Sequence, residues 1–254
     1  MNFRLVRHAM ILLSNNNKTL LVDPILSEKG SLEPVEGVKN QNRNPLVEIS
    51  VPLDTLSSCD AILITHTHRD HFDAKAAEFL PKEKKIFCQP EDRERLLDYG
   101  FKDVIAVDDQ LEWEGINIAR TPARHGYGVV AMKLAPVSGF VLRGPKEPSV
   151  YIAGDSVFYT GTKKVLAKYK PDIVICNAGE ATLSTGRPIT MGIKDIAQIH
   201  EQAPSAKIVA VHMEAWNHCV LTREALGKYV SENRLQDVVL IPSDGQEICF
   251  AKLL

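Results

Sequence analysis

The stretch that decides the fold is Thr65-His66-Thr67-His68-Arg69-Asp70-His71, which directly follows the apolar run Ala61-Ile62-Leu63-Ile64. The apolar run is typical of a buried strand. Three of the eight histidines in the chain, together with a carboxylate, lie within the six residues 66–71 just beyond it. Neutral imidazoles suit zinc and similar cations, and a carboxylate adds the charge that a second divalent ion needs. A solvated turn or a helix start is the ordinary alternative, but the clustering favours a metal site.

The spacing within this cluster predicts two metal positions. On extended backbone, His66 and His68 point to the same side because they are two residues apart. Asp70 and His71 lie far enough along the chain to turn towards a neighbouring position. One ion would therefore take the first pair and another ion the second.

Composition and charge narrow the class of protein. The chain has 254 residues, of which 44% are hydrophobic and 24% charged, so we expect residues 1–254 to form a single globular domain. The net charge is -2 and basic residues are scattered, which predicts neither a nucleic-acid nor a membrane partner. Five cysteines without Cys-x-x-Cys pairs, and a first stretch unlike a signal peptide, predict a cytoplasmic protein.

Hydrophobic periodicity predicts two β-rich halves in which strands alternate with helices. We expect strands at residues 3–6, 11–13, 19–22, 61–64, 86–88, 104–107, 116–120, 129–134, 139–143, 150–153, 173–176, 208–211 and 238–241, and helices at 53–58, 73–80, 91–99, 194–202 and 223–232. Residues 27–52 lack periodicity and are expected to form a long loop of the kind that is usually either functional or mobile, which we interpret as a flap. This pattern predicts an α/β layered architecture in which two sheets face each other and helices lie outside.

Further metal-type residues lie where apolar strands end. Asp23, Asp155 and His212 each follow an apolar strand directly, and His125 follows the strand at 116–120. Singly, these residues are typical of a turn, a helix cap or a packed core histidine. Because layered α/β proteins place their chemistry beyond strand ends, we expect the tips to converge. The candidate metal ligands are His66, His68, Asp70, His71, His125, Asp155 and His212, with Asp23 in support.

Taken in order, these motifs resemble those of the metallo-β-lactamase superfamily over nearly the whole chain. His8-Ala9, Asp23-Pro24 and the stretch at 64–73 are most similar to the branch of ascorbate-lactonase-like hydrolases and acyl-ethanolamine phospholipase D. The resemblance implies a four-layer αββα sandwich with a two-metal centre at one edge of the paired sheets. It implies that His66, His68 and His125 hold one metal, that Asp70, His71 and His212 hold the other, and that Asp155 bridges.

The same resemblance implies supporting roles. Asp23 would hydrogen-bond a ligand histidine and fix its orientation; His8 would do likewise or simply pack. Lactam-hydrolysing relatives have a cysteine where Asp155 stands, so antibiotic hydrolysis is not expected. Two divalent ions are implied, zinc first, with manganese or iron also compatible with a bridging carboxylate. Oxygen-reducing flavodiiron relatives have Glu where His68 stands, so redox chemistry is not expected.

A two-metal centre can activate water at neutral pH, which makes hydrolysis the natural reaction. Asp70 is the candidate catalytic residue, since it can also accept a hydrogen bond from the nucleophile. The leading hypothesis is a hydrolase of a small ester, lactone or amide. The alternative is a phosphodiesterase, and a metal-stabilised binding protein without activity comes third.

Substrate-contacting residues are less well defined by the sequence. Arg69, Trp216 and His218 are the candidates, although the loop after His212 is equally typical of one packed on the core. Cys219 is either a spare soft ligand or an inert buried thiol. Further candidates are Arg124, Tyr127, Glu180 and Arg187. A small-molecule substrate is the expected partner, and a homo-oligomer is left open.

Overall fold

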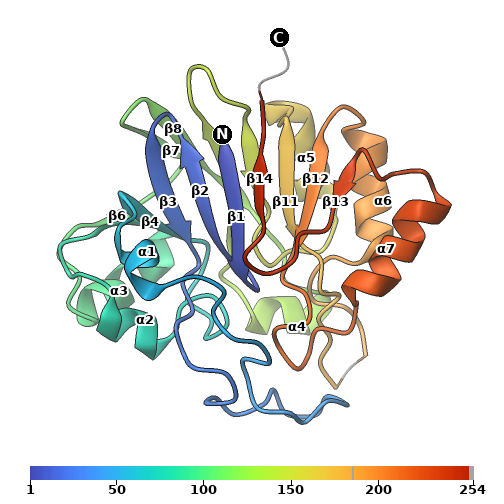
Figure 1. Cartoon of the computed structure of the whole chain (residues 1–254), viewed down its shortest axis with the longest axis horizontal. Helices are drawn as coiled ribbons and strands as arrows, with labels where there is room; N and C mark the ends of the chain where they lie inside the picture. The colour runs from blue at the N-terminus through green and yellow to red at the C-terminus, as the bar shows by residue number, and fades with distance from the viewer. Residues whose placement is uncertain (185, 252–254) are drawn as a thin grey trace.

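The structure, a computed structural model, describes residues 1–184 and 186–251 and contains two seven-stranded sheets (Figure 1). The strands of the first sheet, in spatial order, are β14 (Glu247–Cys249), β1 (Asn2–Arg7), β2 (Met10–Asn15), β3 (Lys18–Val22), β4 (Ala61–Ile64), β5 (Lys85–Cys88) and β6 (Val104–Ala106). Those of the second are β13 (Val239–Leu240), β12 (Lys207–Val211), β11 (Ile173–Asn177), β10 (Val150–Ile152), β9 (Ser138–Arg143), β8 (Ile116–Pro122) and β7 (Gln110–Trp113).

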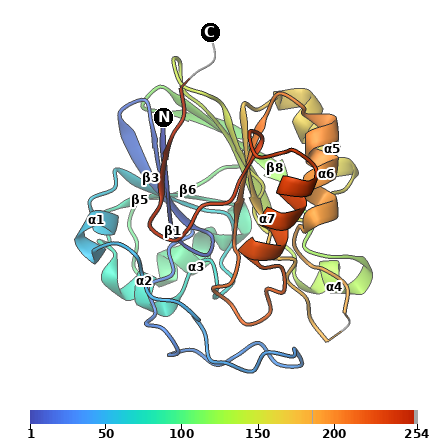
Figure 2. The ribbon, with the colours of Figure 1, turned by 45° about the vertical axis from the view of Figure 1, so that its right-hand side comes forward.

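Helices lie on the outer face of each sheet, as Figure 2 shows. The first sheet is accompanied by α1 (Leu53–Ser57), α2 (Ala74–Phe79), η1 (Pro90–Asp92) and α3 (Arg93–Asp98). The second is accompanied by α5 (Thr160–Tyr169), α6 (Ile193–Gln202) and α7 (Arg223–Glu232). The predicted α/β layered sandwich is therefore confirmed. That residues 1–254 form a single domain stays a prediction.

Strand β4 shows why the run before the histidine cluster is continuously apolar. Ala61 and Leu63 belong to the core between the two sheets, whereas Ile62 and Ile64 belong to the core under the outer helices. Both faces of the strand are therefore buried, as in other parallel sheets. Strands β3, β4, β5 and β6 are parallel neighbours, so their carboxyl ends meet at one edge of the sheet.

The expected strand at residues 129–134 is wrong, because this segment forms helix α4 (Gly128–Lys133). Its β-branched composition favours a strand, but β8 pairs directly with β9 and leaves no position for another strand between them. The segment instead lies on the surface, where Val129 is 66% and Met132 is 77% exposed. Strands β7 and β14 and helix α5 were not expected. The other expected elements agree with the structure to within a few residues.

Residues 27–52 form the expected long loop, with one isolated bridge between Leu32 and Asn44. The loop lies at the lower edge of the sandwich in Figure 1. In the described part of the chain, every helix is too short or too polar to cross a membrane. Cytoplasmic localisation stays a prediction.

Candidate metal centre

The seven candidate ligands converge at the edge of the sandwich beside the 27–52 loop. Their donor atoms form clusters within which all atoms lie no more than 4.8 Å apart. One cluster, which we call the outer group, is His66, His68 and His125. A second contains Asp70, His71 and His212, which we call the inner group, together with His8. The third cluster joins the two groups and consists of His66, His71 and Asp155.

Asp155 presents one carboxylate oxygen to each group. Its Oδ1 lies 3.2 Å from His71 Nε2 and 3.5 Å from His212 Nε2, in the inner group. Its Oδ2 lies 3.3 Å from His125 Nε2 and 3.9 Å from His66 Nε2, in the outer group. The Asp155 carboxylate therefore lies between the two groups, with a different oxygen nearest to each of them.

The hydrogen bonding of these atoms fits a metal site. The Nε2 atoms of His66, His71 and His212 and the Oδ2 atom of Asp155 are buried, and none has a hydrogen-bond partner among the described residues. Buried polar groups in proteins are normally paired, because an unpaired group loses its solvation. Imidazole nitrogens and carboxylate oxygens directed at a common space match the ligand preferences of divalent transition metals.

Asp23 orients one histidine in each group. His71 Nδ1 donates to Asp23 Oδ2 at 2.8 Å, so that His71 Nε2 points towards Asp155. Asp23 reaches the outer group through Thr65. His66 Nδ1 donates to Thr65 Oγ1 at 3.0 Å, and Thr65 Oγ1 donates to Asp23 Oδ2 at 2.7 Å. The backbone N–H of Thr65 also donates to Asp23 Oδ1 at 2.7 Å. The residue at the tip of β3 is thus tied to the start of the histidine cluster.

Two further histidines are oriented by groups that the sequence did not identify. His125 Nδ1 donates to the backbone carbonyl of Ile189 at 2.8 Å. His212 Nδ1 lies 3.5 Å from Cys219 Sγ, within hydrogen-bonding distance for sulfur. Cys219 lies outside the three donor clusters, so it contacts the centre through His212. No sequence pattern identifies a thiol seven positions after a histidine as its partner.

The pKa values of the buried groups follow from burial and from their neighbours. Burial lowers the pKa of His66 well below its ordinary value, and the nearby His71 lowers it further, so His66 is neutral with a lone pair free. Burial also acts to lower the pKa of His71, but the carboxylates of Asp155 and Asp23 outweigh it and raise the pKa to about 10. Burial acts to raise the pKa of Asp155, but the surrounding histidines, His71 first, hold it well below its usual range.

His8 lies against the inner group. Its ring centroid is 3.6 Å from that of His212, and its Nε2 is 3.6 Å from Asp70 Oδ2. The residue is completely buried and has a left-handed φ of 62°, a conformation that costs energy for a residue other than glycine. His8 therefore packs on one ligand histidine and borders the carboxylate of another candidate ligand.

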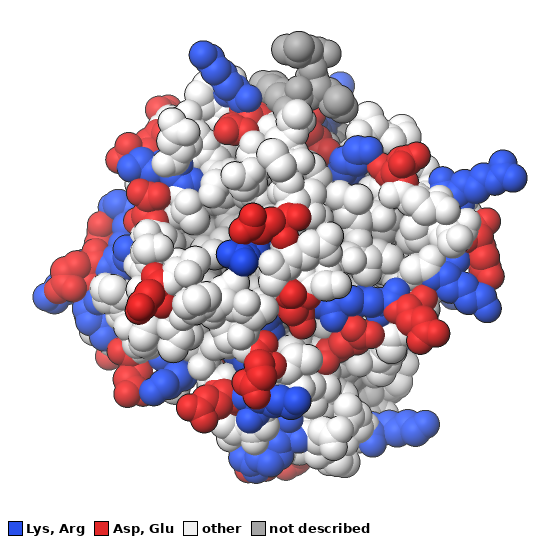
Figure 3. Space-filling view, viewed as in Figure 1, with Lys and Arg blue, Asp and Glu red and all other residues white. Residues whose placement is uncertain are grey.

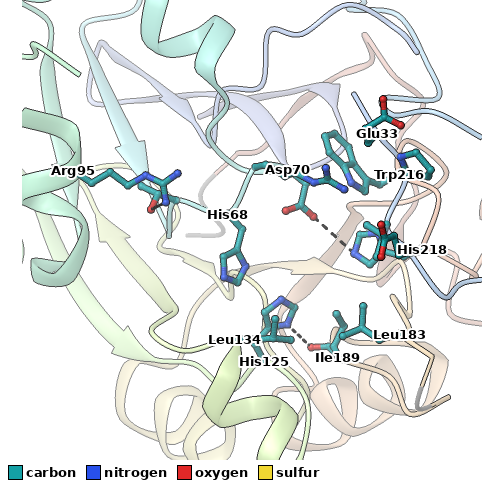
Figure 4. Close-up of a pocket in the computed structure, with 15 residues that line it drawn as sticks. Glu33, His68, Asp70, Arg95, His125, Leu134, Leu183, Ile189, Trp216 and His218 are labelled. Atoms are coloured by element: carbon teal, nitrogen blue, oxygen red, sulfur yellow. Dashed lines mark hydrogen bonds and ion pairs between the residues drawn. The ribbon is translucent and has the colours of Figure 1, made fainter. Parts of the chain in front are cut away.

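A cavity of about 560 Å³ opens onto the centre (Figure 4). His68 and His125 of the outer group line it, and Asp70 is the inner-group residue that does so. The predicted substrate residues Arg69, Trp216 and His218 also line the cavity. His218 Nε2 lies 3.8 Å from Asp70 Oδ2, and burial lowers the pKa of His218 to about 4.

Other lining residues were not expected individually. These are Glu33, Pro34, Val35, Glu36, Thr67, Arg95, Leu134, Leu183 and Ile189. The sequence signal for four of them was the aperiodic 27–52 loop. Of the remaining candidates, Arg187 lies over the ring of Tyr127 at 4.2 Å, and neither residue lines the cavity. Arg124 and Glu180 also lie outside its lining.

Known proteins identify the family. The profile of the beta-lactamase superfamily domain matches residues 18–213. The chain belongs to this superfamily. Among curated proteins of the superfamily, the UPF0173 protein YddR of Bacillus subtilis is 37% identical, over 98% of this chain and 100% of that protein. A UPF0173 metal-dependent hydrolase of Methanosarcina mazei is 28% identical, over 95% of each chain.

Two solved structures are similar to this chain over almost its whole length. An isothiocyanate hydrolase from Delia radicum gut bacteria is 35% identical with a TM-score of 0.95, covering 99% of this chain and 100% of the other. A possible metal-dependent hydrolase from Veillonella parvula is 34% identical with a TM-score of 0.94, covering 98% of each chain. The predicted superfamily is therefore confirmed.

Proposed function

We propose that this protein is a hydrolase that uses two divalent ions to add water to a small neutral substrate with an electrophilic carbon and an apolar substituent, and that this substrate is an isothiocyanate. The observation that carries the two-metal part is the division of the Asp155 oxygens between the outer and the inner group. The substrate part is supported by the solved isothiocyanate hydrolase, which is 35% identical to this chain. The ester, lactone or amide expected from the sequence shares the electrophilic carbon.

The proposed ligands follow the two groups. The outer group would hold one ion and the inner group the other, with Asp155 shared between them. When bound, two such ions lower the pKa of a water molecule towards neutrality and polarise the substrate. The four imidazole nitrogens nearest Asp155, which belong to His66, His71, His125 and His212, are ligands that zinc prefers. The carboxylates are also compatible with manganese or iron.

Asp70 connects the centre to the substrate cavity. Its Oδ2 lies 3.6 Å from His8 Nε2, 3.7 Å from His212 Nε2 and 3.8 Å from His218 Nε2. A carboxylate in this position can accept a hydrogen bond from the attacking water and orient its lone pair. His218 lies on the cavity side of Asp70, where a neutral imidazole can donate a hydrogen bond to the substrate (Figure 4).

The overall reaction consumes one water for each isothiocyanate. The water oxygen forms a bond with the central carbon of R–N=C=S, and one water proton goes to nitrogen, which gives the thiocarbamic acid R–NH–C(=S)–OH. The C–N bond then breaks as the hydroxyl proton moves to nitrogen. The products are the amine R–NH₂ and carbonyl sulfide. Val35, Leu134, Leu183, Ile189 and Trp216 provide an apolar lining for the group R.

Phosphodiester hydrolysis is the second candidate, and the observation that favours it is the pair Arg69 and Arg95 on the cavity lining. Glu33 and Glu36 on the same lining oppose a negatively charged substrate. On the face shown in Figure 3, basic and acidic side chains are interspersed, so that face has no extended basic area for a polyanion.

The test is a substrate screen on protein loaded with zinc, manganese or iron(II). Elemental analysis should give two ions per chain. Amine release from a small alkyl or aryl isothiocyanate should then show a higher kcat/KM than hydrolysis of a lactone, an ester or a phosphodiester of similar size. A phosphodiester preferred by about tenfold or more would favour the second candidate. Absence of turnover with both ions bound would favour a binding protein.

A further inference from the structure

The tip of the 27–52 loop forms one wall of the substrate cavity. Residues 33–36 line the cavity together with Trp216 and His218. In Figure 4, Glu33 lies beside Trp216, on the opposite side of the cavity from Arg95. The loop has no regular secondary structure, so its position depends on contacts with the rest of the chain.

The side chain of Asn217 fixes this tip. It is 2% exposed, and its Oδ1 accepts hydrogen bonds from the backbone N–H of Val35 at 2.9 Å and from Asn44 Nδ2 at 2.8 Å. Its Nδ2 donates to the carbonyls of Val35 at 3.1 Å and Asn40 at 2.7 Å. Asn44 Oδ1 accepts a further hydrogen bond from the backbone N–H of Asn217 at 2.8 Å. Each donor and acceptor of the Asn217 amide is therefore used.

The two ends of the loop are fixed by buried charged residues. The Arg7 guanidinium, completely buried, donates to the carbonyls of Ile25 at 2.6 Å, Ser27 at 3.0 Å and Val47 at 3.1 Å. The carboxylate of Asp73, also buried, accepts hydrogen bonds from the backbone N–H groups of Leu26 at 3.1 Å and Ser27 at 2.8 Å. Both the start and the end of the loop are thus tied to the body of the protein.

Each of these anchors is close in sequence to a residue of the centre. Arg7 directly precedes His8, and Asp73 is two positions after His71. Asn217 stands between Trp216 and His218. The hydrogen bonds that hold the loop therefore tie it to the segments that carry the centre and line its cavity.

Open space borders the loop segment 33–40 in two places. A second cavity, of about 530 Å³, adjoins the Asn44–Asn217 pair, which we call the clamp, and is lined by Val38, Asn40, Leu183, Asn217 and other residues. Residues 33–36 border the cavity at the centre, and the adjoining residues 37–40 border the second cavity. Val35 packs against the core that contains Trp216. The second cavity beside residues 37–40 remains open. Without the amide hydrogen bonds, the tip has room to move.

We propose that the Asn44–Asn217 pair makes the 27–52 loop a preformed wall that selects substrates by the size of their apolar substituent. A wall that is already ordered saves the ordering cost on binding and rejects groups that would displace it. The size selection rests on the proposed function, whereas the fixed position of the wall does not.

The kinetic test uses Asn217→Ala and Asn44→Ala, with Asn42→Ala as the matched control at an exposed position of the same loop. Metal-loaded proteins are assayed with isothiocyanates from methyl to phenylethyl. We expect both clamp variants to raise KM by about tenfold for the preferred substrate and to flatten the dependence on size, with kcat and metal content close to wild type. An unchanged size profile, or a uniform loss of kcat that follows metal loss, would overturn the proposal.

Limited proteolysis provides a readout that needs no substrate. In both clamp variants, a protease should cleave within residues 28–45 of metal-loaded protein faster than in wild type or Asn42→Ala. If no substrate is turned over but the cleavage differs, the proposed function fails and the fixed wall stands. If cleavage rates are equal, the wall is not held by the clamp. Should Asn217→Ala fail to fold, Asn44→Ala decides the outcome.

Discussion

The outer and inner groups share Asp155 but differ in depth. Two of the three outer residues, His68 and His125, line the substrate cavity, whereas His71 and His212 of the inner group do not. The inner histidines are enclosed by other side chains. His71 Nδ1 is hydrogen-bonded to Asp23, His212 Nδ1 is hydrogen-bonded to Cys219, and the ring of His8 packs on the ring of His212. If two ions bind as proposed, we expect the outer position to meet the substrate and the inner position to hold its ion more tightly.

The most disruptive change should be Asp155→Ala, because it removes the one residue that both groups share. We expect metal to be lost from both positions and kcat/KM to fall by more than about 100-fold, beyond the effect of an outlying hydrogen-bond partner. Elemental analysis and steady-state kinetics provide the measurement, and Asp108→Ala, at an exposed position, is the control. Equal metal content in Asp155→Ala and wild type would remove the bridging assignment.

Asp23→Ala should have the next largest effect. Asp23 contacts His71 directly and His66 only through Thr65, so its loss should weaken the inner position more than the outer one. We expect the affinity for metal to fall by about 10–100-fold. A metal titration that resolves two binding steps separates the positions, and equal weakening of both steps would contradict the proposed difference in depth.

The sequence predicted which residues converge at this edge, because several of them stand at or just beyond the end of a buried strand, where the apolar pattern is local. Asp23, Asp155 and His212 are read directly from such ends. The groups that orient the candidate ligands and the loop belong instead to segments that come together only in the folded chain. Cys219 and the carbonyl of Ile189 belong to this class, as does Asn217.

The same contrast explains the errors in the fold. Residues 129–134 were predicted as a strand from composition, but whether an apolar segment joins a sheet depends on a free neighbouring strand. Strand β14 pairs with β1, from the opposite end of the chain, which no local pattern indicates. Long, strongly periodic elements such as α7 were located from the sequence, with the expected bounds.

A smaller effect is expected at Cys219, because it acts on one inner histidine through a single weak hydrogen bond. Cys219→Ala should lower the affinity of the inner position for metal by up to about tenfold, the low end for such partners. Cys219→Ser should retain most of the affinity, since a hydroxyl can accept the same hydrogen bond. If both substitutions weaken binding equally, the sulfur packs against His212 without orienting it.

The smallest effect on the proposed reaction is expected at Arg95, on the rim of the outer position. Its Nη1 lies 3.3 Å from Thr67 Oγ1, and that hydroxyl already donates to Asp92 Oδ1 at 2.6 Å. The guanidinium can therefore leave this contact without leaving a buried partner unpaired.

A neutral isothiocyanate gains little from a cation at the rim, whereas a phosphodiester gains a charge-assisted hydrogen bond. Arg95→Ala should change kcat/KM for the isothiocyanate by less than about threefold, while removing a charged contact of this kind costs a phosphodiester about tenfold or more. A loss of similar size for both substrates would mean that Arg95 shapes the outer position itself, and the difference between the two groups would then extend to the Thr67 side of the cavity.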